Sequence, residues 1–426
     1  MDTKYLKLCI IGLGYVGLPL AVEFGKKRNT LGFDINKKRI SELKQHKDTT
    51  LAINSDEISE AKFLNFSSFK DDLINCNCYI VTVPTPIDEF NKPNLQPLKD
   101  ATSMIAKFLK PGDIIIYEST VYPGCTEEVC IPILEKNSGL NFNIDFFCGY
   151  SPERINPGDD LHRLKDIKKV TSGSNESCAI LIDNLYNEII EAGTFKAKSI
   201  KVAEAAKIIE NTQRDINIAL INELSMLFNE INIDTEAVLN AAETKWNFNS
   251  YKPGLVGGHC ISVDPYYLTY KAEQIGFQTK MILAGREINN YVPKYVANKL
   301  LEKIKQKSIS KNARILIMGI TFKENCTDIR NSKVIELINF ISSFKDQNFK
   351  IDIFDPWLCE KDSGILKNFN IISKPEKDNY EALIIAVKHK EFIELGQQKI
   401  KSFLKKNSVL FDLKYTVSSE DSDFRL

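Results

Sequence analysis

The stretch LCIIGLGYVGLPLAVEFGKKRNTLGFD, residues 8–34, decides the fold of this chain of 426 residues. Its apolar start predicts a buried strand, the glycines of GLGYVG follow directly, and Leu18 to Lys27 is predicted to be a helix. A second predicted strand ends at Asp34, about 20 residues after Gly12. GxGxxG between a strand and a helix, followed at this distance by an acidic residue, is typical of a Rossmann unit. The stretch therefore predicts a doubly wound α/β domain.

The same stretch indicates which dinucleotide would bind. Glycines let the backbone approach a pyrophosphate, whose charge is stabilised at the N-terminus of the following helix. Asp34 would accept a hydrogen bond from a ribose 2′-hydroxyl and repel a 2′-phosphate, so the sequence predicts NAD rather than NADP. Lys37, Lys38 and Arg39 weaken this preference. The alternative for these three is a solvated helix face, with Arg39 beside the adenosine.

Three further predicted strands, residues 78–83, 113–118 and 146–150, end in polar residues. Ligands of doubly wound sheets bind at the carboxyl ends of the strands. We therefore expect the following side chains to line the site: Thr85, Thr120, Glu153 and Arg154. For the two threonines alone, ordinary loop chemistry is the alternative interpretation.

From about Ser199 to Ile231 apolar residues recur with the period of a helix, and no proline interrupts them. The predicted helix is much longer than an average one. We expect this helix to link two domains and to offer a dimer surface. Four polar residues fall near one of its faces, Lys207, Asn211, Arg214 and Asn222. The alternative is a hydrated, charged face. Apolar neighbours indicate partial burial instead, which would lower the pKa of Lys207 and suit it to acid–base chemistry.

The C-terminal part repeats the β-α-β pattern without the glycine motif. Strands are predicted at residues 314–318, 350–354, 382–387 and 409–413, with a helix from about Ser332 to Phe344. Lys323 and Arg330 follow the first of these strands and are candidate anion contacts, with plain surface charge as the alternative. The pattern predicts a domain for a phosphate-bearing ligand other than a dinucleotide. A polar tail is predicted from Ser418 onwards.

The stretch PGLVGGHCISVDPYY, residues 253–267, places Cys260 behind a glycine turn and Asp264 four residues later. Glycines let the backbone come close to a ligand because they have no Cβ. A carboxylate near a thiol could orient a water or a neighbouring base. The alternative is a buried structural cysteine in a tight turn, which is a common environment for this residue.

Composition excludes several classes of protein. Lys+Arg and Asp+Glu are both 56, so zero net charge gives no indication of a nucleic-acid or membrane-surface partner. The ten cysteines include no CxxC pair, so we expect free thiols in a reducing cytoplasm and no metal site. Glycines, Pro19 and Glu23 interrupt the apolar start of the chain, which argues against a signal peptide or membrane span.

Several motifs together resemble one family: GLGYVGLPLA with Asp34, STVYPG, YSPERINPG, AKIIENTQRDINIALINE, GGHCISVDPYYL and GITFKENCTDIRNS. In this order, over about residues 5–415, they resemble the UDP-glucose/UDP-mannuronic-acid dehydrogenase family. TKWNF and PGLVGGHC are most similar to its UDP-N-acetylhexosamine (UDP-GlcNAc/UDP-GalNAc) 6-dehydrogenases, which supply precursors for bacterial surface polysaccharides. Many UDP-ManNAc relatives read PGPGVGGHC and carry an arginine shortly upstream, whereas here Leu255 replaces a glycine and the upstream cation is Lys245. This departure favours UDP-GlcNAc or UDP-GalNAc over UDP-ManNAc or UDP-glucose.

We therefore predict two Rossmann-like domains joined by a helical domain with one long helix. The predicted parts are an NAD-binding domain at residues 1–198, a central dimerisation domain at 199–305 and a UDP-sugar-binding domain at 306–426. The resemblance implies a four-electron, NAD-dependent oxidation of the sugar C6 alcohol to a carboxylate. It implies a thiohemiacetal and then a thioester on Cys260, which water hydrolyses. The implied partners are a UDP-sugar and a second copy of the chain.

The family's functional residues map onto this sequence as follows. Catalysis is assigned to Cys260, Lys207, Asn211, Asp264, Thr120 and Glu153. Cofactor binding is assigned to Gly12, Gly14, Tyr15, Val16, Gly17, Asp34, Arg39, Thr85, Thr120 and Arg330. Substrate binding is assigned to Glu153, Arg154, Lys207, Asn211, Arg214, Tyr251, Gly257 and Lys323.

The resemblance also implies particular roles. Lys207 would serve the proton transfers and stabilise the oxyanion, which Asn211 also holds, while Asp264 and Thr120 would place the hydrolytic water. His259 is predicted to pack or orient rather than act as a base. Two alternatives stay open. A two-electron dehydrogenase on this scaffold would not need Cys260. An inactive nucleotide-sugar-binding protein is disfavoured by the intact set of catalytic residues.

Overall fold

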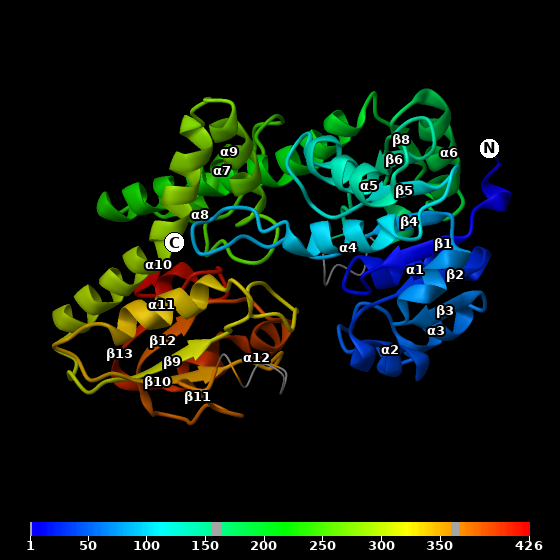
Figure 1. Ribbon diagram of the computed structural model, residues 1–426. Helices are drawn as coiled ribbons and strands as arrows, with labels where there is room; N and C mark the ends of the chain where they lie inside the picture. Colours follow the sequence, from blue (N-terminus) through cyan, green and yellow to red (C-terminus); the bar gives the residue numbers. More distant parts are fainter. Residues whose placement is uncertain (1, 156–162, 359–363, 365) are drawn as a thin grey trace. The chain divides into compact units, whose positions relative to one another are not determined.

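The computed structural model describes residues 2–155, 163–358, 364 and 366–426. Residues 156–158 of the YSPERINPG motif, His162 and Cys359 lie outside them. The chain forms two compact units (Figure 1). The first runs up to Glu210 and adds Tyr266–Gln278, and the second comprises Asn211–Pro265 and Thr279–Leu426. The division into three domains stays a prediction.

The first unit is built on a parallel six-stranded sheet in the order β3-β2-β1-β4-β5-β6. Its strands are β1 Leu8–Ile11, β2 Thr30–Phe33, β3 Leu64–Ser67, β4 Cys78–Val81, β5 Ile114–Tyr117 and β6 Phe147–Tyr150. This is the strand order of a dinucleotide-binding Rossmann sheet, so the predicted doubly wound fold is confirmed. The order reverses between β1 and β4, which puts a ligand crevice at the carboxyl ends of these two strands.

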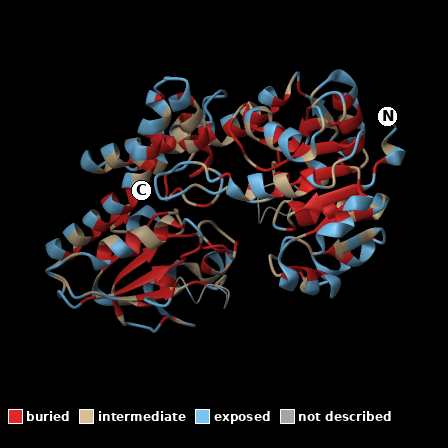
Figure 2. Cartoon of the chain, viewed as in Figure 1, coloured by how far each residue is buried: buried red, intermediate tan, exposed pale blue. Residues whose placement is uncertain are grey.

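Most strands of this sheet are buried (Figure 2), and their buried side chains are largely apolar on both faces, so helices pack on both sides of the sheet. The helices of the unit are α1 Gly17–Lys27, α2 Lys37–Lys44, α3 Ser55–Glu60, α4 Gln96–Ala106, α5 Ile131–Ser138 and α6 Glu176–Asn187. Leu8 and Ile10 share one core with α1 and α6, where the rings of Phe24 and Tyr186 lie 5.9 Å apart. A small second sheet pairs β7 Lys169–Thr171 with β8 Thr194–Lys196.

The long helix predicted at residues 199–231 is confirmed as α7, Ile200–Glu230. Three helices follow it before the second large sheet, α8 Thr235–Ala242, α9 Asp264–Gln274 and α10 Lys280–Gln306. Pro293 lies inside α10, so a helix extends across a residue that the sequence would suggest as a breaker. Among the described helices, none is long and apolar enough to cross a membrane.

The second unit contains another parallel six-stranded sheet, ordered β11-β10-β9-β12-β13-β14. Its strands are β9 Arg314–Met318, β10 Lys350–Phe354, β11 Asn370–Ile371, β12 Tyr380–Ile385, β13 Leu404–Asp412 and β14 Phe424–Arg425. The helices α11 Lys333–Ser342 and α12 Lys390–Lys401 complete it. Side chains alternate along β9, so Ile317 packs with α10 and α11 whereas Leu316 packs with α12. The predicted Rossmann-like repeat is therefore confirmed.

The prediction of a polar tail from Ser418 is wrong. β14 adds a parallel strand beside β13, and the ring of Phe424 stacks on that of Phe411 at 4.7 Å. Leu426 is fully buried. The polar residues before β14 concealed this strand, because only two apolar side chains at alternate positions carry its packing.

Candidate active site

The glycine turn of the first unit has the geometry that a pyrophosphate needs. Gly12 has φ +94°, and a Cβ on Gly17 would lie 1.8 Å from the carbonyl oxygen of Gly12. A Cβ on Gly14 would meet no atom within 4 Å, so the turn is open at this position. Val16 is the residue before α1, and Tyr15 is half-buried. The first and third glycines thus close the turn, and the second leaves room for a ligand.

Asp34 lies at the end of β2, beside this turn. Its Oδ2 accepts a hydrogen bond from the backbone N–H of Leu13 at 2.9 Å, and its Oδ1 accepts one from Asn36 N–H at 2.8 Å. A carboxylate fixed here is placed to accept from a ribose hydroxyl. The residues present therefore fit the adenosine half of NAD.

Arg39 lies beneath the turn rather than on a solvated helix face. It is 8% exposed, and its Nε donates to the carbonyl of Leu13 at 2.9 Å. Its Nη1 donates to Oδ1 of Asp48 at 2.6 Å. Lys37 and Lys38 are exposed, as the solvated-face alternative expected. The sequence did not indicate Asp48, which neutralises Arg39 and so limits its attraction for a 2′-phosphate.

Thr85 and Thr120 come together after β4 and β5. The hydroxyl of Thr85 donates to the carbonyl of Thr120 at 2.7 Å. The hydroxyl of Tyr267, on α9, donates to the carbonyl of Thr85 at 2.6 Å. These bonds fix the two loops at the edge of the sheet where a ligand would lie. Their roles with a cofactor stay a prediction.

Glu153 follows β6 and is 8% exposed. Its Oε1 accepts from the backbone N–H groups of Arg154 at 2.6 Å and Ile155 at 2.7 Å, and its Oε2 accepts from Lys169 Nζ at 3.0 Å. The guanidinium of Arg154 pairs instead with Glu210, 2.8 Å away. Lys169 was not among the predicted site residues, because a lysine at the start of a short strand resembles ordinary surface charge.

Helix α7 carries Lys207 and Asn211 one turn apart. Lys207 is 8% exposed, so the hydrated-face alternative fails for this residue, whereas it holds for Arg214, which is exposed. Glu204, one turn before Lys207, is fully buried. Its carboxylate accepts from the N–H groups of Gly124 at 2.5 Å and Thr126 at 2.9 Å, and burial raises its pKa to about 7.

The second unit holds the cysteine loop. Cys260 is exposed, which excludes the buried structural cysteine. Its carbonyl accepts from the N–H of Asp264 at 2.8 Å, so the two residues lie one turn apart at the start of α9. Nδ2 of Asn211 donates to Oδ2 of Asp264 at 2.5 Å. An amide, a buried carboxylate and an accessible thiol are therefore assembled within this unit.

The glycines before Cys260 hold the loop close to other backbone. Gly258 has φ +90°, and a Cβ there would lie 2.7 Å from the ring of Phe322. Its N–H donates to the carbonyl of Asn331 at 3.3 Å, and Asn331 Nδ2 donates back to the Gly258 carbonyl at 3.1 Å. A Cβ on Gly257 would lie 2.4 Å from the backbone oxygen of Asn331. Tyr251, which was also predicted to bind the substrate, is half-buried.

His259 has a structural contact. Its Nε2 lies 2.7 Å from Oδ2 of Asp328, and Nη2 of Arg330 lies 2.6 Å from the same oxygen. Burial alone would raise the pKa of Asp328, but the hydrogen bonds from His259 and Arg330 outweigh it and lower this pKa. This geometry supports the orienting role predicted for His259. Arg330 is engaged here, and its contact with a cofactor stays a prediction.

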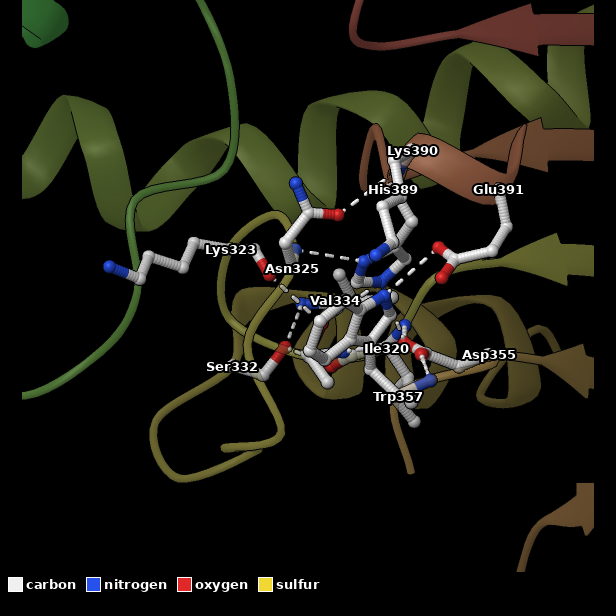
Figure 3. Close-up of polar contacts among 11 residues, drawn as sticks. Ile320, Lys323, Asn325, Ser332, Val334, Asp355, Trp357, His389, Lys390 and Glu391 are labelled. Carbon is white, nitrogen blue, oxygen red and sulfur yellow. Dashed lines mark hydrogen bonds and ion pairs between the residues drawn. The ribbon is translucent and has the colours of Figure 1, made fainter. Parts of the chain in front are cut away.

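Lys323 lies in the loop after β9, and a buried histidine, His389, contacts this loop (Figure 3). The ring of His389 accepts from Asn325 N–H at 3.0 Å through Nδ1, and its Nε2 lies 3.2 Å from both Thr321 Oγ1 and Asp355 Oδ2. Figure 3 shows the Lys323 side chain extending away from this cluster. These hydrogen bonds hold the loop that carries the Lys323 ammonium group after β9.

Comparisons with known proteins agree with this geometry. Residues 6–190, 201–291 and 316–419 match the NAD-binding, central and UDP-binding domains of the UDP-glucose/GDP-mannose dehydrogenase family. The UDP-N-acetyl-D-glucosamine 6-dehydrogenase of Pseudomonas aeruginosa is 56% identical to this chain, and the match covers 99% of this chain and 100% of that protein. The protein of the same name from Salmonella typhi is 54% identical, and the match covers 99% of each chain. The UDP-D-ManNAc dehydrogenase structure from Pyrococcus horikoshii has a TM-score of 0.86 at 26% identity, covering 98% of each chain.

The Rossmann sheet with its glycine turn and Asp34 defines an NAD-dependent dehydrogenase. The chain belongs to the UDP-glucose/GDP-mannose dehydrogenase family. It is therefore an NAD-dependent nucleotide-sugar dehydrogenase whose C-terminal part is a UDP-binding domain. The family resemblance seen in the sequence is confirmed.

Proposed function

We propose that this chain oxidises the C6 alcohol of UDP-GlcNAc to a carboxylate, with transfer of four electrons to two NAD⁺. The single observation that carries the proposal is the Asn211–Asp264 hydrogen bond one turn from the exposed thiol of Cys260. A two-electron alcohol dehydrogenase has no use for this thiol. The names of the two relatives above 50% identity support UDP-GlcNAc as the sugar.

In the first oxidation the sugar C6 alcohol becomes an aldehyde. The glycine turn and Asp34 would hold NAD⁺, which when bound would supply the hydride acceptor. Lys207 and Asn211 are assigned to the reacting oxygen, where the lysine handles the hydroxyl proton and its positive charge stabilises the developing oxyanion. The low exposure of Lys207 supports this assignment, because an ammonium excluded from water interacts more strongly with a nearby anion.

In the second oxidation the thiolate of Cys260 adds to the aldehyde carbon and forms a thiohemiacetal. Loss of its C6 hydride to a second NAD⁺ gives a thioester. Water then attacks the carbonyl carbon, the C–S bond breaks, and the carboxylate and thiol are released. Asp264, with Thr120 and Glu153, is assigned to placing this water and taking its proton. A thiol suits both steps, because it is a good nucleophile as thiolate and a good leaving group.

Initial rates on a panel of UDP-sugars test the proposal. We expect kcat/KM to be highest on UDP-GlcNAc among UDP-GlcNAc, UDP-GalNAc, UDP-ManNAc and UDP-glucose. Cys260→Ser should be unable to complete turnover while NAD⁺ affinity is retained. Activity confined to another sugar would overturn the substrate, and full turnover by Cys260→Ser would overturn the thiol mechanism.

We also propose an oligomeric state, a cellular compartment and a biosynthetic role for the enzyme. Exposed apolar side chains on α7, including Ile209, Leu220 and Leu227, support a homodimer formed through this helix. The nine described cysteines form no disulfide with one another, which supports a reducing cytoplasm as the place of the reaction. The product would be a uronic-acid precursor for surface polysaccharide synthesis.

A further inference from the structure

We propose that Lys169 is a positioning residue that holds the Glu153 carboxylate for thioester hydrolysis, in a buried cluster with Glu118 and Tyr186. The inference rests on the proposed function, because it concerns the step that releases the product from Cys260. It assigns a role to three residues that the predicted site did not include.

Four elements bring the cluster together. Lys169 begins β7 and is 2% exposed, and its Nζ donates to Oε2 of Glu118 at 2.9 Å and to Oε2 of Glu153 at 3.0 Å. Glu118 follows β5, and the Tyr186 hydroxyl on α6 donates to its Oε1. Lys169 Nζ also lies 5.4 Å from the centre of the Tyr186 ring. The ammonium group is therefore enclosed by two carboxylates and an aromatic face.

Both oxygens of Glu153 are consequently fixed. Its Oε1 accepts two backbone N–H groups, from Arg154 and Ile155, and its Oε2 accepts the Lys169 ammonium. Oε2 accepts only this one hydrogen bond, so it keeps unused acceptor capacity, whereas Oε1 is fully engaged. A carboxylate held in this way can take a proton from water without first having to turn, which is the geometric requirement for a general base.

The charges explain why Lys169 is needed. Arg154 is adjacent to Glu153 in sequence, but its guanidinium pairs with Glu210. Lys169 is therefore the cation that neutralises Glu153. Burial raises the pKa of Glu118. Burial opposes the charge on Lys169, but the two carboxylates outweigh it and raise the pKa of this lysine.

Glu153 therefore lies between two neighbours of opposite charge, the ammonium of Lys169 and the carboxylate of Glu118, which share one hydrogen-bonded cluster. The charged and titratable groups around Glu153 in the described chain are Lys169 from β7, Glu118 after β5, Tyr186 from α6, and Arg154 with its partner Glu210. Removing the lysine should move the pH midpoint of thioester hydrolysis upwards, and removing the charge of Glu118 should move it downwards.

Single-turnover kinetics on the full-length enzyme test the inference. Enzyme with saturating NAD⁺ is mixed with a smaller amount of UDP-GlcNAc and quenched with acid, and the adduct on the Cys260 peptide is followed by mass spectrometry from about pH 6 to about pH 9. For Lys169→Met we expect thioester hydrolysis to slow about 100-fold near neutral pH, so that the adduct accumulates, with the pH midpoint moved to higher pH.

Two further variants sharpen the result. Lys169→Arg keeps the cation and should restore hydrolysis to within about tenfold of the wild type with an unmoved midpoint. Glu118→Gln should move the midpoint to lower pH, opposite to Lys169→Met, which a purely structural role would not produce. Lys168→Met is the matched control, since this neighbouring lysine is exposed and only its backbone carbonyl contacts Arg154.

The outcomes separate the two proposals. Hydrolysis by Lys169→Met at the wild-type rate and midpoint would overturn the role of Lys169 alone. If that variant does not fold, judged by NAD⁺ affinity and circular dichroism, the shift in Glu118→Gln decides, and an unmoved midpoint there overturns the inference. A wild-type enzyme that forms only one NADH for each UDP-GlcNAc consumed would overturn the proposed function, and with it the step assigned to Glu153.

Discussion

A hydrogen bond of 2.5 Å joins Nδ2 of Asn211 to Oδ2 of Asp264, although 53 positions separate the two residues. It connects α7 to the first residue of α9. Because Asp264 is one turn beyond Cys260, the bond also fixes the carboxylate relative to the thiol. Two motifs that are far apart in the sequence thus form one local structure.

Replacing Asp264 by Asn should keep an acceptor oxygen for the hydrogen bond from Asn211 but remove the negative charge. We expect kcat to fall about 100-fold, since a positioned acid–base group commonly contributes at least that much. The affinity for NAD⁺ should stay within about twofold, because the nucleotide turn lies in the first unit. Steady-state kinetics with fluorescence titration of NAD⁺ checks both values. An Asp264→Asn enzyme with the wild-type kcat would remove Asp264 from the mechanism.

Replacing Asp34 by Ala should weaken NAD⁺ binding. A hydrogen bond to a charged group contributes about 1.5–3 kcal/mol, which corresponds to a rise in KM of about tenfold to a hundredfold. Arg39 should not substitute as a 2′-phosphate ligand, because Asp48 and the Leu13 carbonyl hold its guanidinium. Rates with NAD⁺ and NADP⁺ measure the preference. Lys38→Ala, an exposed neighbour, is the control, and an Asp34→Ala enzyme with an unaltered NAD⁺ KM would contradict the assignment.

Replacing His389 by Ala should loosen the loop that presents Lys323. It leaves Asp355, buried at 7% exposure, without its imidazole partner, at a cost of about 1–3 kcal/mol in stability. We expect a lower melting temperature and a KM for UDP-GlcNAc raised about tenfold, with NAD⁺ affinity unchanged. Lys390→Ala, exposed beside His389, serves as the control. An unchanged sugar KM in folded His389→Ala would show that the loop does not contact UDP.

Glu204 predicts a specific dependence of stability on pH. Burial raises its pKa from 4.5 to about 7, so the folded chain holds the proton more tightly than the unfolded chain. Its contribution to the free energy of unfolding is full below about pH 4.5 and is lost as the pH rises to about 7, by on the order of 3 kcal/mol.

Glu204→Gln is neutral throughout, so it should lack this loss. Urea unfolding of both proteins at about pH 5 and about pH 8 gives the two differences. Other buried groups cancel in the comparison, because they are common to both proteins. Equal pH dependence in the wild type and the variant would contradict the raised pKa.

If the dimer forms through α7, replacing exposed apolar side chains of this helix by charged ones should give monomers. Leu220 and Leu227 are 52% and 53% exposed, so lysine at both positions should not disturb the fold of one chain. We expect light scattering to give half the wild-type mass for this double variant. Glu223→Gln, exposed on the same face of the helix, should keep the wild-type mass. A double variant of undiminished mass would exclude α7 as the interface.

Local patterns explain what could be predicted from the sequence. The strand, glycine turn and helix at residues 8–27 are specified by adjacent residues, and α7 by a long uninterrupted period. The position of Asp264 near Cys260 could be expected because only four positions separate the two residues in the sequence. These features need no information about distant parts of the chain.

The remaining features depend on packing between distant segments. Lys169 and Glu118 resemble surface charges in the sequence, and only the folded sheet shows that each has a buried partner. The burial of Arg39 depends on Asp48, and β14 depends on the edge that β13 offers. The residue types alone do not show whether such a side chain lies in a buried site or on the solvated surface.

The most direct test of the central claim is the number of NADH molecules formed for each UDP-GlcNAc consumed, with limiting sugar and excess NAD⁺. The thiol mechanism predicts two NADH and a uronic-acid product. One NADH, with an aldehyde as the final product, would contradict it and would leave Cys260 without a catalytic role.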